Sequence, residues 1–60
     1  MPYTIREFDG RDIRPVGGYY STEQDARAEA YQWSTTYHVR TWVREEREVC
    51  SYDAEGLEVE

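Results

Sequence analysis

Residues 22–37, with the sequence TEQDARAEAYQWSTTY, decide the fold of this chain. Four residues in this stretch recur at the spacing of one helical face: Ala26, Ala30, Trp33 and Tyr37. This spacing predicts an α-helix whose stripe of alanines and aromatic rings packs against the rest of the molecule. The segments on both sides of the helix read as strands, so each needs an apolar surface to lie against.

The start of this helix has clear capping signals, and its end has few. Either Ser21 or Thr22 can act as N-cap, because each is followed by a suitable polar residue three positions later. Glu23 and Arg27 are spaced to form an ion pair on the helix surface. Residues 34–36 are poor helix formers and no glycine follows them, so we expect fraying at this end.

A hairpin is predicted before the helix. Residues 3–8 are strand-like, and Asp9-Gly10 is a strong hairpin turn signal. The return strand has two candidates, residues 13–16 or residues 18–20 after a long loop, and we favour the second.

The segment after the helix alternates with the period of a strand. Residues 39–44 place three side chains on one face, Val39, Thr41 and Val43. The opposite face receives Arg40, Trp42 and Arg44. If the valines face the helix, the Trp and the two arginines lie on the far side of the sheet.

A second hairpin follows, with residues 45–47 as a polar turn and residues 48–52 as the partner strand. Its register stays open, because a shift of one residue exchanges the faces of Val49 and Cys50. Residues 53–60 form either a frayed acidic tail or a short edge strand. Residues 1–60 are therefore predicted to be one small α+β domain, an antiparallel sheet of three to four strands with one helix on one face, in the order β-β-α-β-β.

Charge restricts the classes of partner. The 60 residues have a formal net charge of −6, and all seven basic residues are arginine. An acidic chain disfavours sequence-independent binding to nucleic acid or to an anionic membrane, so we expect neither partner. The N-terminus lacks a signal-peptide pattern and there is one cysteine, which favours the cytoplasm. Residues 18–30 resemble strand-to-helix junctions of many small bacterial proteins, which implies a bacterial or phage source without assigning a family.

No pattern of catalytic, cofactor-binding or metal-binding residues is found, and we expect a protein that is not an enzyme. His38 and Cys50 could pair as base and nucleophile, but nothing suggests a third orienting group. The acids of residues 45–48 do not match a calcium loop, and Gly17-Gly18 does not extend into a phosphate-binding motif.

The best candidate for a binding site is the Arg and Trp face of residues 39–44. We expect Arg40, Trp42 and Arg44 to contact a partner, with Tyr31 as a further contact on the helix. The predicted function is a non-enzymatic protein-interaction module that self-associates, as a homodimer, or docks a protein partner through the open sheet face. The alternative is an acidic inhibitor or antitoxin-like modulator of a basic, nucleic-acid-handling partner.

Overall fold

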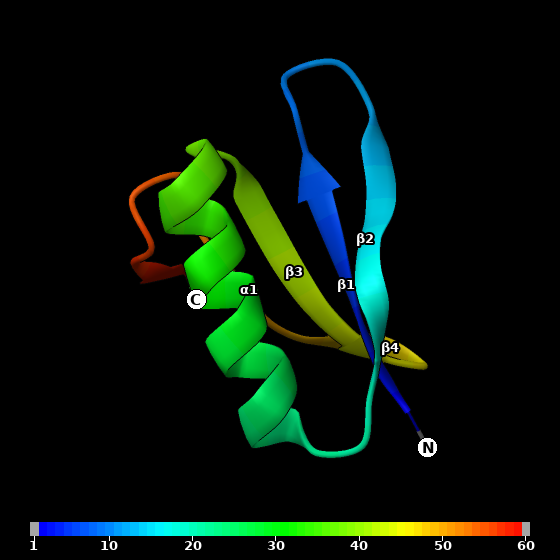
Figure 1. Ribbon diagram of the computed structural model, residues 1–60. Helices are drawn as coiled ribbons and strands as arrows, with labels where there is room; N and C mark the ends of the chain where they lie inside the picture. Colours follow the sequence, from blue (N-terminus) through cyan, green and yellow to red (C-terminus); the bar gives the residue numbers. More distant parts are fainter. Residues whose placement is uncertain (1, 60) are drawn as a thin grey trace.

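The computed structural model describes residues 2–59 and has the predicted α+β class. Within these residues, one helix lies on one face of a five-stranded antiparallel sheet with the order β2-β1-β3-β4-β5 (Figure 1). The sheet has one strand more than the predicted maximum of four. The elements are β1 (Tyr3–Phe8), β2 (Ile13–Tyr20), α1 (Glu23–Tyr37), β3 (Arg40–Glu45), β4 (Arg47–Tyr52) and β5 (Glu58–Val59).

The first hairpin turns at Asp9-Gly10, as predicted. The Asp9 carboxylate accepts hydrogen bonds from the backbone N–H groups of Arg11 and Asp12, at 2.9 and 3.0 Å. The preference for residues 18–20 as the return strand is wrong, because β2 begins at Ile13, which pairs with Phe8. The strand continues through both candidate segments because the backbone kinks at Gly17, whose φ of 68° lies in the left-handed region.

The helix is capped by Thr22, whose hydroxyl oxygen accepts a hydrogen bond from the Asp25 N–H at 3.1 Å. Glu23 and Arg27 form the predicted ion pair at 2.8 Å. Residues 34–36 are helical and α1 continues to Tyr37, while fraying at this end stays a prediction. Ser34 near this end makes a polar contact with the sheet through Thr41.

The core lies between α1 and the sheet. Its buried apolar residues are Ile5, Ala26, Ala30, Val43, Cys50 and Tyr52. Ser34 is also fully buried, and its hydroxyl lies 2.7 Å from that of Thr41, which in turn donates to the Ala30 carbonyl at 3.2 Å. Ser34 therefore takes the place in the buried stripe that was predicted for Tyr37, which is 58% exposed.

The second hairpin has a single turn residue, Glu46, with a positive φ of 58°. Val43 pairs with Cys50. The register shifts after this pair, because the next pair joins Arg44 to Glu48. This register directs Cys50 toward the helix. The sequence had left open the face on which Cys50 lies. Of the two possibilities for the tail, residues 58–59 form the edge strand β5, while residue 60 lies outside the described residues.

Candidate functional site

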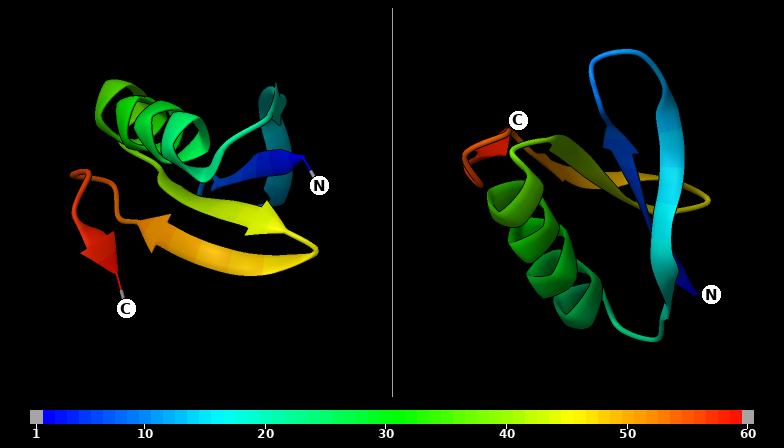
Figure 2. Two further views of the ribbon diagram at one scale, coloured as in Figure 1. Left: turned by 90° about the horizontal axis from the view of Figure 1, so that it is seen from below. Right: turned by 45° about the horizontal axis from the view of Figure 1, so that its top comes forward.

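The sheet face opposite α1 has no element packed on it within residues 2–59, as the left view of Figure 2 shows. On β3, Thr41 and Val43 are fully buried on the helix side. The alternation of the strand therefore places Arg40, Trp42 and Arg44 on the uncovered side, as the sequence indicated. Their part in binding a partner stays a prediction.

Strand β1 adds two residues to this surface that sequence reasoning missed. Arg6 is the cross-strand partner of Trp42, and Phe8 is the partner of Arg40. Cross-strand partners share a face, so Arg6 and Phe8 lie on the uncovered side. The alternation of residues 3–8 could have identified them, because Ile5 and Glu7 are buried whereas Arg6 and Phe8 lie between and after them on the opposite face.

The edge strand β2 extends the same surface with apolar groups. Ile13 pairs with Phe8, and Pro15 pairs with Arg6. Ile13 is 58% exposed and Phe8 is 39% exposed, so both present apolar area to solvent. We refer to these seven residues as the open face: Arg6, Phe8, Ile13, Pro15, Arg40, Trp42 and Arg44.

The arginines of the open face differ from those on the helix side in their partners. Arg14 contacts the carboxylates of Glu7 and Asp9, at 2.9 and 3.8 Å. Arg27 contacts those of Glu23 and Glu58, at 2.8 and 3.0 Å.

Within residues 2–59, no ion pair involves Arg6, Arg40 or Arg44. The Arg40 guanidinium instead lies 5.0 Å from the centre of the Trp42 ring, a cation–π contact. Trp42 itself is half-buried. Three guanidinium groups that form no ion pair within residues 2–59 thus lie on the same face as one indole.

A buried polar network on the other side of β1 holds this strand in position. Glu7 is only 5% exposed. Its carboxylate accepts hydrogen bonds from the Trp33 indole N–H at 2.6 Å and from Arg14 Nε at 2.9 Å. Because strand side chains alternate, fixing Glu7 toward the helix also fixes Arg6 and Phe8 toward the open face.

Tyr31 does not join the open face. It lies on the helix, where its ring makes an edge-to-face contact with Tyr52 at 6.3 Å between centroids. Tyr31 also lines a shallow hollow on the helix side with Arg27, Ala28, Gln32 and Tyr52. The structure therefore separates Tyr31 from the three predicted contact residues on β3.

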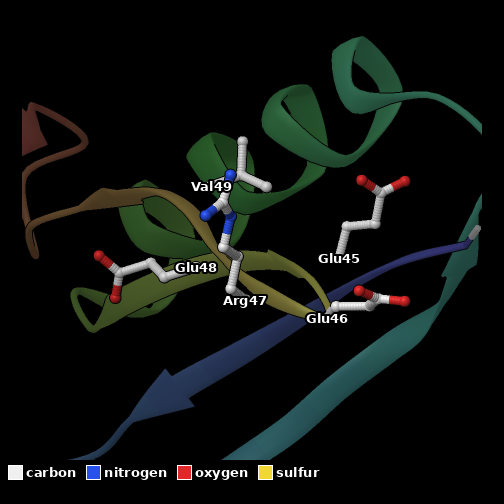
Figure 3. Close-up of a pocket in the computed structure, with 5 residues that line it drawn as sticks. All are labelled: Glu45, Glu46, Arg47, Glu48 and Val49. Carbon is white, nitrogen blue, oxygen red and sulfur yellow. The ribbon is translucent and has the colours of Figure 1, made fainter.

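The acids of the β3–β4 turn do not converge on one point. Figure 3 shows that Glu45 and Glu46 lie to one side of the turn and Glu48 to the other, around a hollow that Arg47 and Val49 also line. No group of three or more His, Cys, Asp or Glu side chains within residues 2–59 is arranged to hold a metal ion.

His38 and Cys50 occupy separate environments. His38 is the exposed C-cap of α1, with a φ of 55°. Cys50 is 6% exposed, and burial raises the pKa of its thiol, an effect that the nearby Arg27 opposes. A thiol with a raised pKa is a poor nucleophile at neutral pH.

Comparison with known proteins gives no match: no family model, curated protein or solved structure is significantly similar to the chain. Among the described residues, the one helix is too short and too polar to span a bilayer. Inferences about function therefore depend on the open face itself.

Proposed function

We propose that this protein is a small, non-enzymatic interaction module that docks a partner protein through the open face. The observation that supports this proposal is the group of three arginines near Trp42 that form no ion pair within residues 2–59, next to the exposed side chains of Phe8 and Ile13. Arginine and aromatic residues are enriched in protein interfaces, where they supply bidentate hydrogen bonds and large apolar contacts.

Charge favours a different protein over a second copy of this chain as the occupant. A symmetric face-to-face dimer brings the same patch of both copies together. The patch with Arg6, Arg40 and Arg44 of one copy would then face the same positively charged patch of the other. Like charges across an interface cost affinity, so a partner with carboxylates is the better complement.

The acidic-modulator alternative has less support from the structure. Several carboxylates are already neutralised by arginines: those of Glu7, Glu23 and Glu58. The acids of the β3–β4 turn point in different directions (Figure 3). A mimic of a phosphate backbone would need a continuous row of unpaired acids. We therefore keep this function as the second candidate.

Face-specific crosslinking in the cells that carry the gene tests the proposal. A photoreactive phenylalanine analogue replaces Phe8 on the open face or, as a matched control, the exposed Tyr37 on the helix. We expect one discrete protein adduct from position 8 and none from position 37. The adduct should disappear when Arg40→Glu and Arg44→Glu are combined with the probe at position 8.

The oligomeric state provides an independent check. Sedimentation of the wild type and of Trp42→Ala should show monomers in both cases. Equal adducts from positions 8 and 37, or an adduct at position 8 that survives charge reversal, would contradict docking through the open face. A wild-type dimer that Trp42→Ala dissociates would identify a second copy as the occupant.

A further inference from the structure

We propose that the occupant of the open face is an extended acidic peptide segment in which two carboxylate side chains flank one apolar side chain at alternate positions. This inference rests on the proposed function and specifies the chemistry of the partner. It follows from the spacing of the arginines, from the distribution of acids around the face and from the absence of ion pairs to these arginines within residues 2–59.

The spacing of β3 determines the pattern of the segment. Arg40 and Arg44 are four residues apart on a strand, which corresponds to roughly 13 Å, with Trp42 midway between them. An extended peptide places its residues i, i+2 and i+4 on one side at the same spacing. Carboxylates at i and i+4 then meet the two guanidinium groups, and an apolar residue at i+2 meets the indole.

Strands β1 and β2 supply the side contacts for such a segment. Arg6, directly opposite Trp42, provides a third guanidinium group. Phe8 and Ile13 form an apolar pair beside Arg40, which accepts a further apolar side chain. Each guanidinium group can donate two parallel hydrogen bonds to a carboxylate, because no carboxylate of the described residues occupies it.

The acids around the open face favour a short segment over a nucleic acid. Asp9 and Asp12 lie in the β1–β2 turn at one end of the strands, and Glu45 and Glu46 lie at the β3–β4 turn at the other. Glu48 is the cross-strand partner of Arg44, although no ion pair joins the two within residues 2–59. A long polyanion that follows the strands meets acids at both ends. A segment that spans only Arg40 to Arg44 ends before both turns. A short segment therefore meets fewer of these acids than a long polyanion does.

The Trp42 ring also favours a peptide. The Arg40 guanidinium lies 5.0 Å from the centre of this ring. Carboxylate binding keeps Arg40 in place, since the guanidinium edge donates hydrogen bonds while its face contacts the indole.

The test is a titration of the ¹⁵N-labelled full chain followed by NMR. The probe is a blocked peptide of alternating serines with glutamate, leucine and glutamate in the intervening positions. The same peptide with glutamine in place of glutamate is the control for charge, and single-stranded oligothymidylate is the control for the ligand class. We expect the amide signals of Arg6, Phe8 and β3 and the Trp42 indole signal to shift with the glutamate peptide, while the Trp33 indole signal stays in place.

Matched variants test the role of the arginines. Arg40→Glu with Arg44→Glu should raise the Kd for the glutamate peptide about tenfold or more. Arg11→Glu with Arg47→Glu makes the same change in net charge outside the open face and should alter the Kd less than about twofold. If the first double variant loses its dispersed spectrum, Arg40→Gln with Arg44→Gln replaces it, with the same direction of effect.

Several results would overturn the inference. These are equal binding of the glutamine peptide, tighter binding of oligothymidylate, shifts confined to the helix side, or equal losses in both double variants. If the glutamate peptide does not bind while crosslinking from position 8 still yields an adduct, the acidic class is wrong and docking through the open face stands. If the peptide binds and no adduct forms, the chemistry of the face is right and the proposed function is wrong.

Discussion

The buried carboxylate of Glu7 should contribute much of the stability of this small fold. It accepts a hydrogen bond from the Trp33 indole in a half-buried setting and one from Arg14, whose side chain is 62% exposed. A hydrogen bond to a charged group contributes about 1.5–3 kcal/mol, whereas an exposed ion pair contributes about 0.2–1 kcal/mol. Glu7→Ala should therefore reduce the free energy of unfolding by about 2–4 kcal/mol.

This loss is large for a 60-residue chain, whose total stability is about 3–9 kcal/mol. The melting temperature should fall by at least about 10 °C. Glu7→Gln keeps an acceptor for the indole but loses the negative charge, so we expect about 1 kcal/mol. Urea unfolding followed by far-UV circular dichroism measures each value, with Glu55→Gln on the exposed surface as a control that should change stability by less than about 0.5 kcal/mol.

Double-mutant cycles identify which hydrogen bond matters. The coupling of Glu7 with Trp33, measured with Trp33→Phe, should exceed its coupling with Arg14, measured with Arg14→Ala, because Arg14 is screened by solvent. The two single-residue packing losses cancel in each cycle. An equal or larger coupling with Arg14, or a loss below about 0.5 kcal/mol in Glu7→Ala, would refute this account.

Two further predictions concern the β4–β5 turn and the core. Gly56→Ala should lower the free energy of unfolding by about 1–3 kcal/mol, because φ at Gly56 is 85° and a Cβ atom there would lie 2.6 Å from Thr35 Cγ2 and 2.9 Å from Tyr31 Cε1. Gly18→Ala, where no atom lies within 4 Å of the added Cβ, is its control in the same urea assay, and an equal loss in both variants would contradict the clash. Burial raises the pKa of Cys50 above its ordinary value of 9.0, so the folded state holds this proton more tightly and stability should fall as the pH rises above about 9. In Cys50→Ala this fall should be shallower, and an identical pH dependence of unfolding in both proteins would show that Cys50 does not cause it.

The local signals of the sequence predicted the elements well, because each depends on residues only a few positions apart. The capping residues before α1, the Glu23 and Arg27 pair and the Asp9-Gly10 turn all appear in the structure. The alternation of residues 39–44 predicted the face of each side chain on β3. These features follow from helix and strand periodicity alone.

The tertiary structure decided what depends on the packing of distant segments. Ser34 is buried because Thr41 satisfies its hydroxyl, and Glu7 is buried because Trp33 and Arg14 satisfy its carboxylate. Neither partner can be recognised from residue spacing, since a polar side chain enters a core only when distant groups complete its hydrogen bonds.

The residues of the open face also divide into those that the sequence indicated and those that only the tertiary structure brought together. The sequence alone indicated Arg40, Trp42 and Arg44, because they alternate within one strand. Arg6 and Phe8 joined them only when β1 paired with β3, and Tyr31 was separated from them when α1 packed on the opposite side. Pairing between strands far apart in the chain sets which surfaces become neighbours, and periodicity within one strand holds no information about that pairing.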